Sequence, residues 1–118
     1  MSNYAKINIS SEARTELHDQ LSLTGAEISI NNLPAGASVP FVHSHKQNEE
    51  IYIILSGNGK AIIDNDTVVL NTGDFIRISP SAKRQFFAGE NSPISFVCIQ
   101  VKENSLEQYT VNDAIISE

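Results

Sequence analysis

The sequence predicts an all-β protein that folds as one domain, a sandwich or barrel of short strands. From residue 26 onward, short apolar runs alternate with turns rich in glycine, proline, asparagine and aspartate, which is the pattern of antiparallel β proteins. No segment there has the periodicity of a convincing helix. A length of 118 residues suits one domain with its own core. We therefore expect one unit over residues 1–118, with its core at about 26–102 between an N-terminal and a C-terminal extension.

The elements are expected in the following order. Residues 1–25 carry weak signals, for a short strand at 7–9 and a short helix at 10–17. After them come strands separated by turn residues. The expected strand ranges are 26–33, 43–45, 50–55, 60–64, 67–70, 75–78, 85–88 and 94–102. The sequence Gly57-Asn58-Gly59 predicts a tight turn between the third of these strands and the fourth.

Charge and composition argue against several classes of partner. The formal net charge of -6 disfavours nucleic acid or an anionic membrane surface, because both need a basic face. No apolar run has the length of a membrane span, and residues 1–11 lack the basic and apolar regions of a signal peptide. The single cysteine, Cys98, rules out an internal disulfide and fits a reducing compartment. We therefore expect a cytoplasmic protein with a small-molecule ligand.

A pair of histidines and a nearby carboxylate suggest a metal site. His43 and His45 are separated by one residue, so on an extended strand both side chains point to the same face. Glu50 opens the apolar run 51–55 and is expected at the start of the next strand, facing the pair. Two imidazoles and one carboxylate are a common ligand set for first-row metals. The plain alternative is two surface histidines on a polar face, and Glu49 is the alternative carboxylate.

The stretch from Gly36 to Gly57 resembles the first motif of the cupin family. That motif has a glycine, a His-x-His pair, a glutamate three or four residues later, and a second glycine after six further residues. Glu50 keeps the six-residue spacing to Gly57, which favours it over Glu49. Gly36 lies one residue farther from His43 than the motif requires.

The segment from Gly73 to Gln85 resembles the second cupin motif in part. Gly73-Asp74 and Pro80 are present with one extra residue between them, and Ala82 takes the place of a glycine. Counted from Pro80, Gln85 takes the place of the histidine that is usually the last metal ligand in the family. An amide oxygen is a weaker and harder donor than an imidazole. Four roles remain open for Gln85: a weak ligand, the holder of a metal-bound water, a substrate contact, or a hydrogen-bonded polar residue in the barrel mouth.

The resemblance covers most of the chain and implies a double-stranded β-helix, the jelly-roll barrel of cupins, commonly as a homodimer. It implies a divalent metal ion, Fe, Mn, Ni or Zn, held by His43, His45 and Glu50, with Gln85 nearby. Cupins include dioxygenases, decarboxylases, sugar isomerases and epimerases, lyases and non-catalytic ligand sensors. The fold therefore does not select one activity.

Three further residues are candidates for catalysis or substrate binding. Strand parity puts Tyr52 inward with Glu50, as a proton donor, a substrate contact or core packing. Arg77 interrupts an apolar strand and is expected to bind an anion at the barrel mouth or to project into solvent. Arg84 follows Lys83 and adds positive charge, which favours a carboxylate or phosphate ligand unless this loop is only solvated.

Two classes of function follow from these residues. The first is a small metal-dependent enzyme, a sugar-like isomerase or epimerase or an oxygenase, with Tyr52 as its acid or base. The second is a module that binds a small ligand without chemistry, which Gln85 at the histidine position keeps open. A homodimer is expected in either case, because the apolar strand faces exceed what one small barrel buries.

Overall fold

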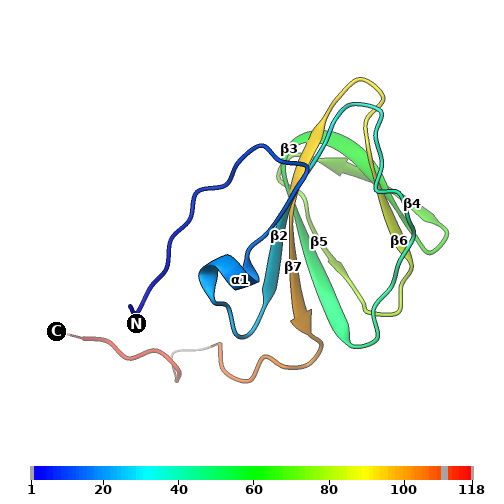
Figure 1. Ribbon diagram of the computed structural model, residues 1–118. Helices are drawn as coiled ribbons and strands as arrows, with labels where there is room; N and C mark the ends of the chain where they lie inside the picture. Colours follow the sequence, from blue (N-terminus) through cyan, green and yellow to red (C-terminus); the bar gives the residue numbers. More distant parts are fainter. Residues whose placement is uncertain (1, 110–111, 118) are drawn as a thin grey trace.

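The computed structural model describes residues 2–109 and 112–117, and its regular structure is almost entirely β (Figure 1). The elements are β1 (Arg14–Glu16), α1 (His18–Leu21), β2 (Glu27–Leu33), β3 (Asn48–Ile63), β4 (Asp66–Asn71), β5 (Phe75–Ile78), β6 (Arg84–Ala88) and β7 (Ile94–Lys102). The predicted all-β barrel is confirmed. Among the described residues, no helix has the length and apolar character to cross a membrane.

Strand β3 belongs to both sheets of the barrel. Its first part, residues 48–57, lies between β5 and β7 in a sheet that continues through β2 to β1. Its second part, residues 58–63, lies between β4 and β6 in the other sheet. Figure 1 shows the two sheets facing each other, with β2, β7 and β5 on one side and β4 and β6 on the other. The inner face of β3 therefore lines the space between the sheets.

The passage of β3 from one sheet to the other depends on Gly57. The pairing register with β7 shifts between Ile54 and Ser56, as in a β-bulge. Gly57 follows with a φ of 78°, and a Cβ at this position would lie 1.8 Å from the carbonyl oxygen of Pro93. Only glycine fits so close an approach. The turn predicted at 57–59 is therefore wrong, because a bulge redirects the strand without ending it.

The core lies between the two sheets and is partly aromatic. The ring of Phe86 stacks on Tyr52 at a centroid distance of 4.2 Å and on Phe96 at 5.1 Å. Ile54 and Ala61, from the two parts of β3, are 1% and 0% exposed. Each large apolar side chain buried in this way contributes about 1.5–3 kcal/mol. The inward direction predicted from strand parity for Tyr52 is confirmed, since it is 4% exposed.

The N-terminal segment differs from its expectation. The strand predicted at 7–9 and the helix predicted at 10–17 are absent, and Arg14–Glu16 forms strand β1 instead. This short strand exists because it pairs antiparallel with the free edge of β2. Pairing with a distant segment thus overrides a weak local helix signal.

The segment 34–47 is also less regular than predicted. The strand expected at 43–45 is absent, and His43 makes only an isolated bridge with Arg84 of β6. Pro40 lacks a backbone N–H, which works against a continuous ladder here. The segment therefore runs along β6 as a connection that touches it at separate points.

Candidate metal centre

Glu50 is a buried carboxylate near the beginning of β3. The residue is 3% exposed and lies in register with Ile78 of β5 and Gln100 of β7. Because side chains alternate along a strand, it faces the barrel interior with Tyr52. A carboxylate is costly to bury unless it is paired or binds a metal ion. The groups around Glu50 therefore decide what this part of the barrel can do.

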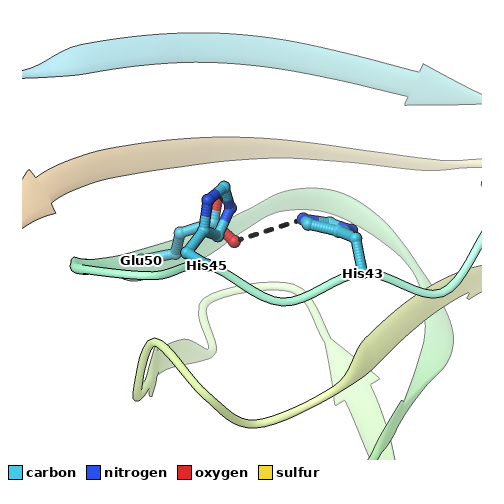
Figure 2. A group of neighbouring side chains, drawn as sticks. All are labelled: His43, His45 and Glu50. Atoms are coloured by element: carbon cyan, nitrogen blue, oxygen red, sulfur yellow. Dashed lines mark ion pairs between the residues drawn. The ribbon is translucent and has the colours of Figure 1, made fainter.

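Two histidines reach Glu50 from the irregular segment before β3. The backbone of His43 exchanges hydrogen bonds of 3.1 and 3.0 Å with Arg84, and the N–H of His45 donates to the carbonyl of Pro80 over 2.7 Å. Nε2 of His43 then lies 3.7 Å from Oε1 of Glu50, and Nε2 of His45 lies 3.1 Å from Oε2. Figure 2 shows the three side chains converging. The predicted grouping of the two imidazoles with the carboxylate is present, although no regular strand carries the histidines.

The three side chains have the separation that a bound cation needs. One ligand atom from each of His43, His45 and Glu50 lies within 4.8 Å of the other two. Metal–ligand bonds of about 2.0–2.2 Å place neighbouring ligand atoms roughly 3–4 Å apart. Nδ1 of His43 and Nε2 of His45 are buried, and neither has a hydrogen-bond partner among the described residues. Buried polar atoms are rarely left unsatisfied, so this donor set fits a divalent metal ion.

Hydrogen bonds and nearby charges keep Glu50 ionised. The Tyr52 hydroxyl donates to Oε1 over 2.7 Å, and the Cys98 thiol donates to Oε2 over 3.3 Å. Burial by itself raises the pKa of Glu50, but these two donors and the charges of His45 and Arg84 hold it below its ordinary value. The carboxylate is thus in the form that binds a cation. Cys98, the single cysteine, is buried and donates a hydrogen bond to the site.

Three neighbours of Glu50, namely His43, Tyr52 and Cys98, are held in their neutral forms. Burial lowers the pKa of His43 against the opposing effect of the Glu50 charge, and neutral imidazole is the form that binds metals. Burial, followed by the proximity of Cys98 and Glu50, raises the pKa of the Tyr52 phenol well above its ordinary value. Burial also raises the pKa of the Cys98 thiol to about 12. Tyr52 and Cys98 therefore act on Glu50 as hydrogen-bond donors.

Arg84, rather than Gln85, lies beside the carboxylate. Its side chain is fully buried, with Nη1 3.5 Å from Oε1 of Glu50 and Nη2 donating to the Ser79 carbonyl over 2.7 Å. Gln85, the next residue of β6, also lines the cavity beside Glu50. The Gln85 amide donates to the carbonyl of Val39 over 2.8 Å. Its amide nitrogen is thus engaged by a backbone carbonyl, and the ligand role named for Gln85 stays a prediction.

The other two predicted site residues lie in different surroundings. Tyr52 is 4% exposed and its hydroxyl is bonded to Glu50. Arg77 is exposed on β5, opposite Ile51 of β3, where its Nη1 donates to the Ser79 hydroxyl over 2.9 Å. Arg77 is not among the residues that line the cavity beside Glu50. A substrate contact from Arg77 would have to be made on the outer face of the sheet.

A cavity of about 410 Å³ opens beside Glu50. A space of this size suits a small ligand. Its lining includes residues that the sequence analysis did not single out, namely Arg14, Asn31, Phe41 and Gln100. Arg14 reaches the cavity because β1 pairs with β2, which sets Arg14 opposite Asn31. No local sequence signal indicates this pairing, so it could not have been found from spacing.

The barrel and its histidine–carboxylate cluster define a jelly-roll protein with the residues of a metal site. A family model described as the Cupin domain matches residues 30–100, more than half of the chain. The matched range contains both histidines, Glu50 and Arg84. The chain therefore belongs to the cupin family.

Individual proteins are similar to this chain to different degrees. A cupin protein from Bacteroides fragilis is 59% identical, with a TM-score of 0.96 over 100% of both chains. A predicted oxalate decarboxylase from Thermotoga maritima is 25% identical, with a TM-score of 0.60 over 64% of each chain. An uncharacterised protein of Methanocaldococcus jannaschii is 33% identical over 66 residues, which are 56% of this chain and 52% of that protein. The chain thus spans about half the length of this curated relative.

Proposed function

We propose that this cupin binds a divalent metal ion through His43, His45 and Glu50 and acts as a small metal-dependent enzyme on a small polar substrate. The observation that carries the proposal is the convergence of the three side chains beside a cavity of about 410 Å³, with two buried imidazole nitrogens that make no hydrogen bond among the described residues. At the position of the fourth protein ligand common in cupins, this chain has Gln85, whose amide is bonded to the Val39 carbonyl. Fewer protein ligands leave more coordination positions open to a substrate.

Each residue of the site has a distinct part in this proposal. The two histidines and Glu50 hold the ion, whether Fe, Mn, Ni or Zn, and Tyr52 and Cys98 fix the carboxylate in one orientation. When bound, such an ion supplies Lewis acidity toward an oxygen of the substrate. Isomerisation or epimerisation of a sugar-like compound and oxygenation are both compatible with this set. The similarity to a predicted oxalate decarboxylase adds decarboxylation of a small acid.

A binding module without chemistry is the second candidate, and the chemistry of the cavity favours it in one respect. The phenol of Tyr52, the predicted acid or base, has a raised pKa. Its hydroxyl donates a hydrogen bond to Glu50. Proton transfer is most efficient when the pKa of the group lies near the working pH. A phenol that stays neutral in this way is suited to orienting the Glu50 carboxylate and poorly suited to acting as an acid or base.

Elemental analysis tests the metal site directly. Protein purified without chelators is expected to hold near-stoichiometric metal or to take it up when Fe, Mn, Ni and Zn are supplied singly. The His43→Ala, His45→Ala double variant is expected to hold none, while His18→Ala serves as the matched control, since His18 lies on α1 away from the cluster. Stoichiometric metal in the double variant, or none in the wild type under any condition, would refute the site.

We also propose that two copies associate through the outer face of the sheet formed by β5, β3, β7, β2 and β1. Along β3 and β5 this face carries Ile51 and Ile53, which are half-buried, with Leu55 and Phe75, which are 46% and 70% exposed. An apolar patch of this kind is typical of an interaction surface. A monomer mass in light scattering at micromolar concentration would contradict the homodimer.

The free, buried Cys98 supports a reducing compartment such as the cytoplasm.

A further inference from the structure

An arginine at the open side of the cavity is held in a fixed direction by buried polar groups. Arg14 lines the cavity, and its Nη1 donates to Oδ1 of Asn31 over 2.8 Å. The amide of Asn31 in turn donates to the hydroxyl of Ser29 over 3.0 Å. Asn31 and Ser29 are 8% and 2% exposed. The guanidinium is therefore anchored through rigid neighbours on β2, while about half of its side chain faces solvent.

The remaining N–H groups of Arg14 are available to a ligand. Its Nη2 lies 3.9 Å from Oε2 of Glu16, beyond hydrogen-bond distance, and both side chains are more than half exposed. Such surface pairs are weak and exchange readily with other partners. The carboxylate of Glu27, also in the cavity lining, is bonded to His18. Neither carboxylate therefore occupies the remaining N–H groups of Arg14.

The charge at the cavity contrasts with the charge of the chain. The protein has a formal net charge of -6, yet two of its three arginines, Arg14 and Arg84, line the cavity. Arg84 offsets the charge of Glu50, so a divalent ion bound there would leave the inner end strongly positive. The carboxylates of Glu27 and Glu50 also line the cavity and balance the two arginines. With a divalent ion bound, the cavity would become positive and would favour an anionic ligand. Guanidinium groups match planar carboxylates through paired hydrogen bonds.

We propose that the cavity takes a small carboxylic acid, with one carboxylate bound by Arg14 and a second oxygen group directed at the histidine–Glu50 cluster. The inner end of this inference rests on the proposed function, and the Arg14 end does not. A carboxylate fits better than a phosphate dianion, because Glu16 lies beside Arg14 and Glu27 lines the same cavity, and both repel a second negative charge. The substrate class is thus a short acid with oxygen groups at both ends.

The test uses titration calorimetry on the full chain loaded with Mn(II), with oxalate, malonate, succinate and glutarate as probes. Malonamide is the neutral probe, and inorganic phosphate is the competing anion. We expect at least one dicarboxylate to bind and malonamide not to bind. Arg14→Gln should lower the affinity for that dicarboxylate about ten- to hundredfold, and Arg14→Lys should lower it less. Arg77→Gln is the matched control and should bind as the wild type does, since Arg77 lies on the outer face.

Three results would overturn the inference. They are the failure of every dicarboxylate to bind, an affinity unchanged in Arg14→Gln, and phosphate binding that depends on Arg14 and exceeds that of the dicarboxylates. Metal affinity measured on the same variants separates this inference from the proposed function. Wild-type protein that takes up no metal but binds a dicarboxylate through Arg14 would refute the metal site and keep the anion site. Wild-type protein that takes up metal but binds dicarboxylates equally well in Arg14→Gln would keep the metal site and refute the anion site.

Discussion

The carboxylate and the histidines of this site are held in different ways. Glu50 lies in the middle of a sheet, paired on both sides by β5 and β7, and both of its oxygens accept hydrogen bonds. His43 and His45 lie in an irregular segment that is attached by a few backbone bonds to Arg84 and Pro80. The carboxylate is therefore preorganised by its own element. The positions of the imidazoles depend on backbone bonds to another segment of the chain. We therefore expect substitutions of the carboxylate and of its surroundings to have different consequences.

The largest effect is expected from Glu50→Gln. This change removes a metal ligand and also leaves the buried guanidinium of Arg84 without its counter-charge. Breaking one partner of a buried pair costs about 3–5 kcal/mol, so metal-free protein should lose stability of that order in urea unfolding. Metal uptake should be abolished.

Glu49→Gln is the control for this variant, since Glu49 neighbours Glu50 on β3 and faces the other side. It should keep both stability and metal. If Glu49→Gln lost the metal while Glu50→Gln kept it, the choice of ligand would be reversed.

An intermediate effect is expected from Tyr52→Phe. The stacked contact with the Phe86 ring and the tilted contact with the Phe96 ring remain, but Oε1 of Glu50 loses its hydroxyl donor. A hydrogen bond to a charged group contributes about 1.5–3 kcal/mol, and groups that orient a metal ligand affect metal affinity about 10–100-fold. Urea unfolding and metal titration measure the two losses. Tyr4→Phe, at a site 81% exposed, should change neither; equal metal affinity in Tyr52→Phe would remove this residue from the site.

The smallest effect concerns His18, which contrasts with His43. Burial lowers the pKa of His43, whereas the hydrogen bond to Glu27, then the charges of Asp19 and Glu27, raise the pKa of His18 above 6.5. A raised folded-state pKa means that His18 stabilises the fold below its unfolded pKa and that this contribution is lost as the pH rises through the folded pKa. The pKa of Glu27 is lowered: burial opposes the shift, and the hydrogen bonds from His18 outweigh it. The stabilisation from Glu27 is therefore lost as the pH falls through its folded pKa.

An NMR titration of the His18 ring checks this difference. The midpoint should lie above 6.5 in the wild type and should fall toward that value in Glu27→Gln. Glu12→Gln, which removes an exposed carboxylate of the same segment, is the control and should leave the midpoint unchanged. A midpoint at or below 6.5 in the wild type would contradict the assignment.

Local patterns were reliable where one short stretch of the chain carried the information. Alternation along residues 50–54 indicated that Glu50 and Tyr52 point inward, and both are buried. The one-residue spacing of His43 and His45 predicted two neighbouring imidazoles, and their rings lie 5.1 Å apart. Counting residues from Pro80 did not indicate that Arg84 of β6 lies beside Glu50. The extra residue before Pro80 leaves the parity of the next strand undetermined. Pairing with β3 brings Arg84 to the carboxylate, and Gln85 also lines the cavity.

The sequence by itself determined the class of the protein: an all-β barrel of the cupin family with a histidine pair and a glutamate in one motif. These features are short-range, since they depend on side-chain alternation, turn residues and spacing within one stretch. Only the tertiary structure decided what surrounds that motif. Arg84, Cys98 and Arg14 come from strands far apart in the chain, and sheet pairing alone brings them to one cavity. Register between distant strands is set by the whole fold, so no local pattern encodes it.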